Sequence, residues 1–186
     1  MADRAQRRFL FLLGSTRSGG NAELLARRAA EHLPAGAEQQ WLTLTDLPLP
    51  AFADQRHDGE YPPPTGHART LLDATLDATD LVIVSPLYWY SVSTPVKHYL
   101  DHWSGWMRVP GTDFKPRMAG RTLWAVSAYA GSDPSDADPL AGMLRRSADY
   151  LSMRWGGLLL GSGSRPGDVL ADEDALLAAK SFLASA

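Results

Sequence analysis

The chain of 186 residues contains no cysteine. This absence excludes disulfide bonds, a thiolate nucleophile and an iron–sulfur cluster ligated by the chain's own thiolates. A protein without disulfides suits a reducing compartment, so we expect a cytoplasmic location. No apolar run approaches the length that spans a bilayer, and we therefore expect no membrane partner.

A strong charge of either sign is lacking as well. The formal net charge is −3, which gives no electrostatic basis for a nucleic-acid partner. Arg4, Arg7 and Arg8 precede an apolar run, as the charged region of a secretory signal does. That run, residues 9–13, is shorter than the apolar region of such a signal, so we expect none. The chain length fits a single domain over residues 1–186.

Apolar runs and helical patterns alternate along the chain, which is typical of an α/β sheet with crossover helices. The expected strands are residues 9–13, 39–44, 80–86, 122–127 and 157–161. The expected helices are residues 22–33, 67–78, 94–103, 139–155 and 172–183. Asn21 and Thr94 are the expected N-caps of the first and third helices.

Five strands and five helices in alternation predict a flavodoxin-like three-layer sandwich, an α/β fold whose five-stranded parallel sheet has the order 2-1-3-4-5. In such sheets, ligands bind beyond the carboxyl ends of the strands, where the strand order reverses. That point lies between the first and third strands. We therefore expect the loops after residues 13, 84 and 126 to carry the site.

The loop Gly14–Asn21 joins a strand to a helix, so its backbone N–H groups converge at the positive end of a helix dipole. Ser15, Ser18 and Asn21 can add hydrogen bonds, and Arg17 can add a charge-assisted fork. The loop matches neither G-x-G-x-x-G nor G-x-x-x-x-G-K-[ST], which disfavours a dinucleotide or triphosphate site of those types. It favours a phosphate monoester such as that of flavin mononucleotide; the alternative is an exposed turn without a ligand.

The loop after the third strand carries three aromatic residues in a row, Tyr88, Trp89 and Tyr90, between prolines. A flat tricyclic ring binds well against such a wall. The alternative is that these side chains pack in the core or at a subunit contact. The loop at residues 127–132 is built mainly of small residues that let backbone approach a ligand, or it is an ordinary turn.

The segments 14–21 and 85–93, followed by a helix with Lys97 and Asp101, resemble the NAD(P)H-dependent FMN reductase family of flavodoxin-like proteins. The resemblance covers residues 9–163 and is strongest in the two loops. Many relatives have a hydroxyl residue directly after the asparagine of the first loop. This chain has Ala22 there, which removes one phosphate donor. The branch of the family with a cysteine motif for an iron–sulfur cluster is excluded.

The resemblance implies non-covalent FMN as cofactor and NAD(P)H as co-substrate. The phosphate would lie on the first loop, and the ring would lie between the two later loops. The cofactor-binding residues that it implies are Ser15, Arg17, Ser18, Gly20, Asn21, Pro86, Leu87, Tyr88, Trp89, Tyr90, Ser91, Ser127, Tyr129 and Gly131. The flavin carries the chemistry, so no side chain is assigned as catalytic.

The implied function is hydride transfer from a nicotinamide to FMN and onward to a small-molecule acceptor: a flavin, quinone or azo compound. A homodimer or homotetramer with the flavin near the interface is also implied. The alternative is a flavodoxin-type electron carrier that does not oxidise NAD(P)H. The mild net charge argues against it, because carriers steer their partners with strong fields. A flavin-free sensor or scaffold is a third possibility.

Three further features leave alternatives open. His98 and His102 have a metal-binding spacing but no evident third ligand, so we expect a solvated helix face and no metal. The proline-rich segment 45–66 is long enough to be functional or mobile. The segment 103–118 is a candidate lid, subunit contact or nucleotide-phosphate patch, or else packs as an ordinary loop.

Overall fold

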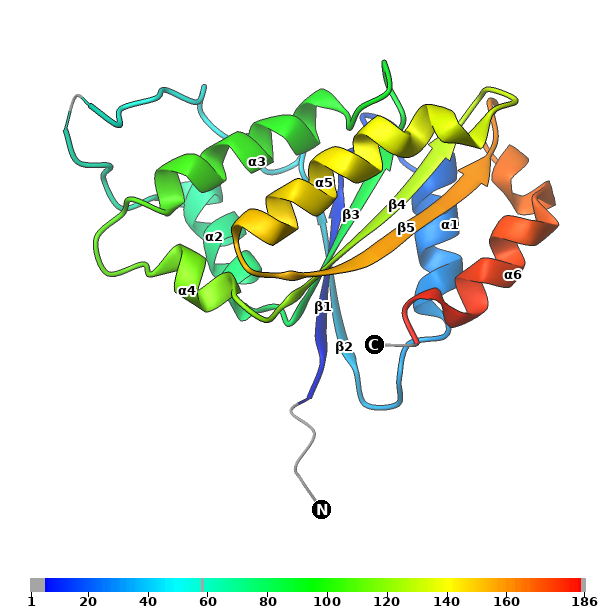
Figure 1. Cartoon of the computed structure of the whole chain (residues 1–186), viewed down its shortest axis with the longest axis horizontal. Helices are drawn as coiled ribbons and strands as arrows, with labels where there is room; N and C mark the ends of the chain where they lie inside the picture. The colour runs from blue at the N-terminus through cyan, green and yellow to red at the C-terminus, as the bar shows by residue number, and fades with distance from the viewer. Residues whose placement is uncertain (1–5, 58, 185–186) are drawn as a thin grey trace.

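The computed structural model describes residues 6–57 and 59–184, which form a parallel sheet between two layers of helices (Figure 1). The sheet order is β2-β1-β3-β4-β5, as predicted, and every pairing is parallel. The strands are β1 (Arg8–Leu13), β2 (Glu38–Thr43), β3 (Asp80–Pro86), β4 (Thr122–Tyr129) and β5 (Arg154–Ser162). The fold is the flavodoxin-like α/β fold that the sequence predicts.

The helices cover the two faces of the sheet. One face carries α1 (Asn21–Ala30) and α6 (Glu173–Phe182). The other carries α2 (Gly66–Asp77), α3 (Thr94–Trp106), α4 (Phe114–Met118) and α5 (Asp138–Tyr150). Two short 3-10 helices, η1 (Pro134–Ala137) and η2 (Asp168–Ala171), precede α5 and α6.

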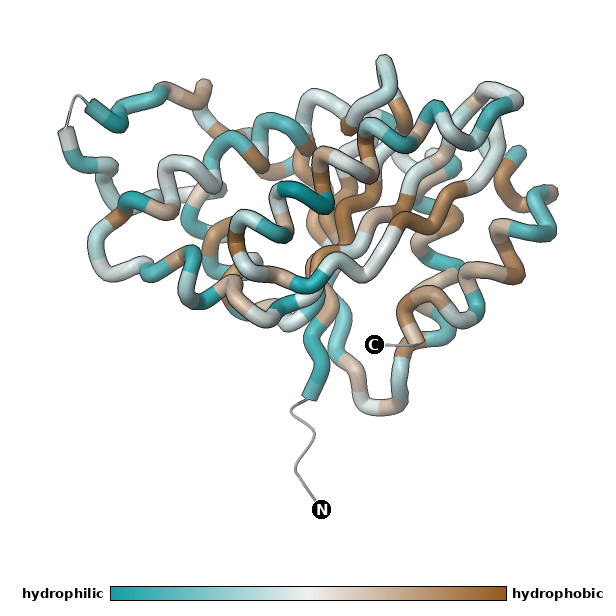
Figure 2. The backbone as a smooth tube through the Cα atoms, in the orientation of Figure 1, coloured by the Kyte–Doolittle hydropathy of each residue, from teal (hydrophilic) through white to brown (hydrophobic). Residues whose placement is uncertain are grey.

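The core consists of two hydrophobic clusters, one on each face of the sheet, and the apolar strands run between them (Figure 2). Successive side chains of a strand point to opposite faces. Leu10 and Leu12 of β1 therefore belong to one cluster, while Phe9, Phe11 and Leu13 belong to the other. Burial on both faces explains why β1 and β3 are apolar throughout rather than alternating.

Several predicted element bounds were wrong. The fourth predicted helix, 139–155, ends at Tyr150, and Trp155 lies in β5. Ser152 adopts a positive φ of 57°, which turns the chain out of the helix, while Leu151 and Met153 fill the core. The first helix ends at Ala30 rather than residue 33, and the short helix α4 was not predicted.

The two predicted N-caps were wrong by one residue. The structure has Gly20 and Ser93 at these positions, and Asn21 and Thr94 are the first residues of the helices. Neither cap position makes a side-chain cap bond. Asn21 and Ser93 instead bind other loops at the carboxyl edge of the sheet.

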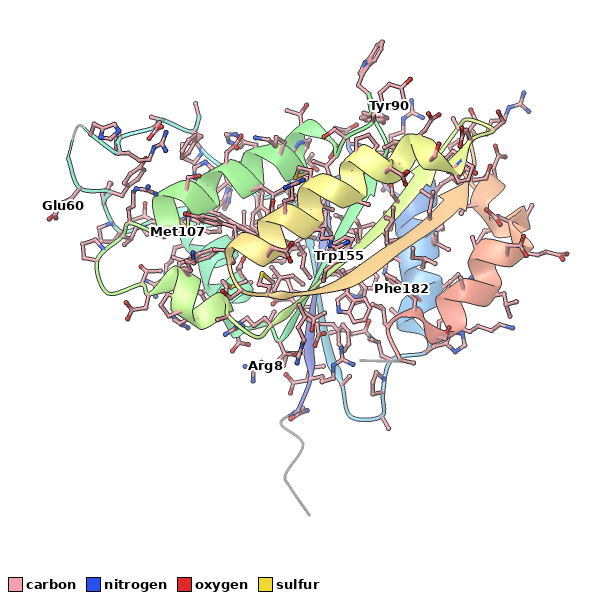
Figure 3. All side chains as sticks on the ribbon, viewed as in Figure 1. Arg8, Glu60, Tyr90, Met107, Trp155 and Phe182 are labelled. Atoms are coloured by element: carbon pink, nitrogen blue, oxygen red, sulfur yellow. The ribbon has the colours of Figure 1, made fainter. Side chains whose placement is uncertain are left out.

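No helix in the described part of the chain is both long and apolar enough to cross a bilayer. The amino ends of the strands form one end of the sheet, here named the amino edge, and their carboxyl ends form the other, here named the carboxyl edge (Figure 3). Arg8 lies at the amino end of β1, and Tyr90 lies at the tip of the loop that follows β3.

Candidate functional site

The loops after β1, β3 and β4 meet at the carboxyl edge of the sheet and are joined by hydrogen bonds. Gly14 N donates to the carbonyl oxygen of Val84 at 2.8 Å. The Ser93 hydroxyl donates to the carbonyl oxygen of Gly14 at 2.6 Å. Leu87 N donates to the carbonyl oxygen of Ala128 at 3.1 Å. These bonds fix the three loops relative to one another, as a preformed binding site requires.

The approach of the β1–α1 loop to α3 depends on a glycine. A Cβ atom at Gly14 would lie 2.2 Å from Cγ2 of Val96 and 2.8 Å from the Ser93 hydroxyl. Any side chain would therefore push the loop away from α3. Gly14 thus sets the distance between the β1–α1 loop and the start of α3.

The loops enclose a cavity of about 130 Å³ at the amino end of α1. Four segments supply its lining: the β1–α1 loop, the start of the β3–α3 loop, the end of β4 and the loop between β5 and α6. The lining residues are Ser15, Arg17, Gly20, Asn21, Ala22, Pro86, Leu87, Tyr88, Ala128, Ala130, Gly163, Ser164 and Pro166. A volume of this size holds a phosphate group but falls short of the space that a whole nucleotide occupies.

The groups at this cavity suit an anion. The Ser15 hydroxyl accepts from Arg17 N at 3.0 Å, so its own proton remains available to a ligand. Arg17 is exposed, and no group within residues 6–57 and 59–184 pairs with its guanidinium. The first N–H groups of α1 have no partner within the helix and lie at its positive end. Together these donors fit a terminal phosphate.

The aromatic residues after β3 form a tight hairpin turn. Tyr88 N donates to the carbonyl oxygen of Ser91, and Ser91 N donates to that of Tyr88, each at 3.0 Å. Trp89 and Tyr90 adopt positive φ angles of 49° and 62°. Two positive φ angles define a type I′ turn, which normally uses Asn-Gly. Trp89 stands at the tip of this turn and is 93% exposed.

The predicted cofactor-binding residues divide into four groups, of which the three at the end of β4 are described below. Ser15, Arg17, Gly20, Asn21, Pro86, Leu87 and Tyr88 line the cavity. Trp89, Tyr90 and Ser91 complete the exposed turn beside it. Ser18 faces a second cleft, on the side of the loop toward β2, together with Thr16, Glu23 and Arg27. The assignment of Ser18 to the phosphate stays a prediction.

At the end of β4, the residues that line the cavity alternate with those predicted to contact the ring, whose assignment stays a prediction. Ala128 and Ala130 line the cavity, whereas Ser127, Tyr129 and Gly131 do not. The two-residue period of a strand explains this, because Ser127 and Tyr129 alternate with the lining alanines. Ser127 is buried, and its hydroxyl has no hydrogen-bond partner among the described residues. A buried hydroxyl without a protein partner is costly and commonly bonds to an ordered water or a ligand.

Sequence reasoning missed the loop between β5 and α6. Gly163, Ser164 and Pro166 form a wall of the cavity. The stretch Gly161–Gly167 holds only small residues, one arginine and one proline, which could have marked a ligand-facing loop. Its closeness to the β1–α1 loop was not evident because the two are more than 140 positions apart in sequence.

The two histidines of α3 contact the proline-rich segment. Nε2 of His98 and Nε2 of His102 lie 2.9 and 3.0 Å from the carbonyl oxygen of Pro50. Burial lowers the pKa of His102, while the bond to Pro50 opposes that shift. The described residues contain no cluster of three or more metal-ligating side chains. The expectation of a solvated face was therefore wrong at these two positions, because both rings are partly buried and contact Pro50.

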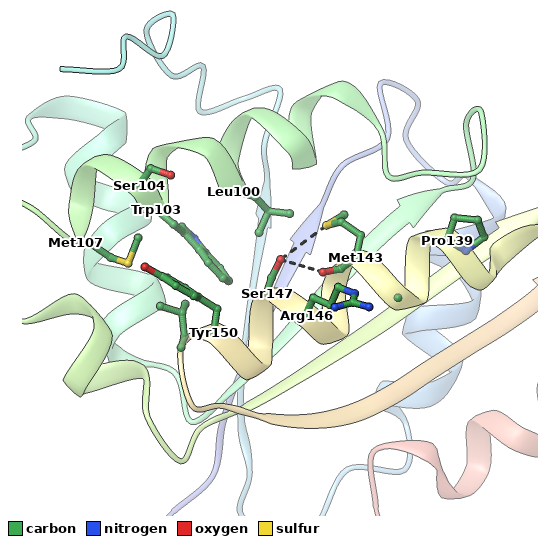
Figure 4. Close-up of a pocket in the computed structure, with 11 residues that line it drawn as sticks. Leu100, Trp103, Ser104, Met107, Pro139, Met143, Arg146, Ser147 and Tyr150 are labelled. Carbon is green, nitrogen blue, oxygen red and sulfur yellow. Dashed lines mark hydrogen bonds between the residues drawn. The ribbon is translucent and has the colours of Figure 1, made fainter. Parts of the chain in front are cut away.

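A cleft of about 700 Å³ lies away from the loops, between α3 and α5 (Figure 4). Leu100, Trp103, Met107 and Met143 give it an apolar lining, and Ser147 donates to the carbonyl oxygen of Met143 at 3.0 Å. Its lining residues come from α3 and α5 and the residues that follow them, in the helix layer that covers one face of the sheet. Ligands of open α/β sheets bind at the carboxyl edge, so this cleft is a surface feature of the helix layer.

Comparisons with known proteins identify the family of this chain. Residues 7–153 match the family model described as NADPH-dependent FMN reductase. A relative from Bacillus subtilis, YwqN, described as an NAD(P)H-dependent FMN-containing oxidoreductase, is 30% identical over 172 residues, or 91% of this chain and 93% of the relative.

Two solved structures extend the comparison. The Trp repressor binding protein from Bacillus subtilis has a TM-score of 0.75 and 27% identity, covering 96% of this chain and 99% of that one. An FMN-dependent NADH-azoreductase from Bacillus anthracis, solved with FMN, has a TM-score of 0.62 and 15% identity, covering 96% and 100%. That second likeness concerns the fold alone. With the family model matched over most of its length, this chain belongs to the NADPH-dependent FMN reductase family.

Proposed function

We propose that this protein is an FMN-dependent NAD(P)H oxidoreductase that passes a hydride from a nicotinamide to bound FMN and then to a flavin, quinone or azo-type acceptor. The observation that carries the proposal is the cavity where Ser15, the Arg17 guanidinium, which pairs with no described residue, and the amino end of α1 meet beside an aromatic turn with positive φ angles. FMN would supply the acceptor of the hydride and the donor of the electrons.

The residues of the cavity fit the phosphate end of FMN. Arg17 would provide a charge-assisted bond, Ser15 a hydroxyl proton and Gly20 a backbone approach without a side chain. The ring would lie outside the enclosed volume, against Leu87 and the turn at residues 88–91. A ring site that is open to solvent leaves one face of the flavin ring accessible. The nicotinamide and then the acceptor would contact that face one after the other.

Backbone groups near the ring would supply the electrostatic part of the chemistry. The β3–α3 turn and the end of β4 are held rigidly by the bonds between Tyr88 and Ser91 and between Leu87 and Ala128. These bonds use the N–H groups of Leu87, Tyr88 and Ser91, so the N–H groups of Trp89 and Tyr90 at the tip of the turn would be the donors that stabilise negative charge on a reduced ring. No acidic or basic side chain lines the cavity apart from Arg17, so no catalytic acid or base is proposed.

The cofactor and the hydride step are tested by spectroscopy. The purified protein is loaded with FMN, desalted and mixed without oxygen with NADPH, NADH or dithionite. We expect retained flavin absorbance that bleaches with a reduced nicotinamide. A flavin that only dithionite reduces would indicate an electron carrier of the flavodoxin type. No retained flavin would contradict the FMN assignment itself.

A homodimer or homotetramer is part of the proposal. The apolar groove between α3 and α5 offers the surface that such an assembly would cover, and Tyr150 at its rim is 60% exposed. Light scattering coupled to size exclusion would give the mass in solution. A monomer at micromolar concentration would contradict this part of the proposal alone. A cytoplasmic location stays a prediction from the absence of cysteine.

A further inference from the structure

The side chain of Asn21 joins two loops that are far apart in sequence. Its Nδ2 donates to the carbonyl oxygen of Arg165 at 2.9 Å, and its Oδ1 accepts from Gly167 N at 2.9 Å. A side-chain amide that makes two opposed bonds is fixed in orientation. Asn21 is therefore committed to residues 163–167, here named the latch loop, rather than to capping its own helix.

The latch loop is held from its other side as well. Oδ2 of Asp168 accepts from Ser164 N at 3.1 Å and from Arg165 N at 2.7 Å. Gly163 N donates to the carbonyl oxygen of Tyr129 at 2.9 Å. The backbone of this loop is thus bonded to the β1–α1 loop, to the end of β4 and to η2. A loop with this many bonds has a defined position before any ligand arrives.

The contact between Asn21 and the latch loop leaves no spare space. A Cβ atom at Gly163 would lie 2.7 Å from Nδ2 of Asn21 and 2.9 Å from Val169 N. A residue with a side chain would force the amide out of its bonds. Glycine at this position and asparagine at position 21 therefore fit one another.

The latch loop is also a wall of the cavity. Gly163, Ser164 and Pro166 stand on one side of it, and Ser15 and Arg17 line it from the β1–α1 loop. The width of the phosphate end is the distance between these two loops. Asn21 sets that distance, because it contributes to the lining and bonds directly to the opposite loop.

We propose that Asn21 is a positioning residue that latches residues 163–167 over the phosphate end of the cofactor cavity. This inference rests on the proposed FMN site and assigns a second loop to it. It predicts that affinity for the phosphate monoester depends on bonds that do not touch the ligand. A direct phosphate ligand at position 21 would not depend on the remote carboxylate of Asp168.

Two variants release the latch loop from opposite sides. Asn21→Ala removes the bonds to Arg165 and Gly167, and Asp168→Ala removes those to Ser164 and Arg165. Asp168 is exposed, so its loss should leave the core intact. Asp174→Ala, an exposed acidic residue in the first turn of α6, is the matched control. Each protein is measured for melting temperature, amide hydrogen exchange and dissociation constants of FMN and riboflavin.

The latch predicts faster exchange at the Gly167 amide in Asn21→Ala and at the Ser164 and Arg165 amides in Asp168→Ala. Each variant should weaken FMN binding by about tenfold, the effect of losing well-placed hydrogen bonds. The double variant should bind FMN more weakly than either single variant. Its loss of affinity should still be smaller than the product of the two single losses, because both act through one loop. Riboflavin, which lacks the phosphate, should bind all variants alike.

Two results would overturn the latch. In one, Asp168→Ala frees the loop amides but leaves FMN affinity unchanged. In the other, the two effects multiply independently, which would make Asn21 a direct ligand. If the wild-type protein binds no FMN, the proposed function fails and the latch falls with it as a cofactor device. That result is distinct from failure of the latch alone, in which the wild-type protein binds FMN and the variants bind it equally well.

Discussion

The amino edge and the carboxyl edge of the sheet differ in whether their polar groups find partners within the chain. At the amino edge, Asp80 is 2% exposed, and its carboxylate accepts from Nε of Arg7 at 3.0 Å, from Nε1 of Trp124 at 3.0 Å and from the Thr79 hydroxyl at 2.7 Å. At the carboxyl edge, the Arg17 guanidinium pairs with no described residue. One edge is satisfied within the chain, and the other offers donors to a ligand.

Positive φ angles occur near both edges, at Ser152 just before β5 and at Trp89 and Tyr90 after β3, but only the latter pair stands in an exposed aromatic turn. The strained positive φ angles of Trp89 and Tyr90 lie at the carboxyl edge, as do the exposed aromatic side chains of that turn. Strain and exposed apolar area cost stability and persist where the surrounding structure enforces them, as at binding sites. The comparison teaches that stability is concentrated at the amino edge and function at the carboxyl edge.

The largest expected effect comes from removing the buried carboxylate at the amino edge. Asp80→Ala leaves Trp124 Nε1 and the Arg7 side chain without their buried acceptor, which typically costs about 3–5 kcal/mol. For a chain of this size the melting temperature should fall by roughly 6–20 °C. Thermal unfolding monitored by circular dichroism measures it.

The matched control lies at the same edge. Asp77 pairs with Arg8 at 3.2 Å, but the two side chains are 70% and 42% exposed, so Asp77→Ala should change stability by less than about 1 kcal/mol. Equal losses in the two variants would mean that burial at the amino edge does not determine stability.

The second largest effect comes from the open edge. Arg17→Ala should raise the dissociation constant of FMN about 10- to 150-fold, the range for a lost charge-assisted bond. The melting temperature of the protein without FMN should stay within about 2 °C, because an exposed side chain without a partner contributes little. Calorimetric titration gives the affinity.

Arg28→Ala removes a similar charge from α1, outside the cavity, where Arg28 pairs with Glu31 at 3.1 Å. This variant should bind FMN like the wild type. A parallel loss of affinity in both variants would reduce the role of Arg17 to long-range attraction.

The third effect separates stability from function in a single turn. The double variant Trp89→Asn, Tyr90→Gly gives the type I′ turn its preferred residues and should stabilise the protein by about 1 kcal/mol, or roughly 2–4 °C. Flavin affinity should fall several-fold, because the aromatic contact area is lost. Melting curves and fluorescence titration measure the two quantities.

Tyr150→Ala serves as its control, since this exposed aromatic residue lies at the far groove. It should leave flavin affinity unchanged. A turn variant that is less stable than the wild type would show that the positive φ angles are not a source of strain.

The smallest effect concerns pH and the proline-rich segment. Burial lowers the pKa of His102 in the folded protein, so the unfolded chain binds more protons below about pH 6.5. Stability should therefore fall as the pH drops through that value. His98 adds to the shift, and Asp101 opposes it.

His102→Gln removes the titrating ring and retains an amide that can donate to Pro50. The decrease in melting temperature between about pH 7 and pH 5 should be smaller in this variant than in the wild type. His32→Gln, at an exposed position after α1, is the control and should keep the wild-type slope. Identical slopes in all three proteins would contradict the assignment to His102.

Local signals in the sequence sufficed for the sheet and for two of the loops. The apolar runs at residues 9–13 and 81–84 identify buried strands because both faces of a central parallel strand are covered. Alternation then fixes the strand order and the edge that carries the site. Ser15 and Arg17 follow directly from their place between a strand and a helix.

Long-range contacts explain what the sequence did not reveal. Asn21 reads as an N-cap, yet its side chain bonds to Arg165 and Gly167. His98 reads as part of a solvated face, yet it binds the carbonyl oxygen of Pro50. Partners of this kind are chosen by tertiary packing, which a local pattern does not contain.

The most direct test of the division between the edges is amide hydrogen exchange with and without FMN. The account predicts slower exchange on FMN binding in the loops at residues 14–22, 86–91, 128–131 and 163–167, with no change at the amino edge around Thr79 and Asp80. Protection centred on the groove between α3 and α5, or spread evenly over both edges, would contradict the claim that the carboxyl edge is the functional site.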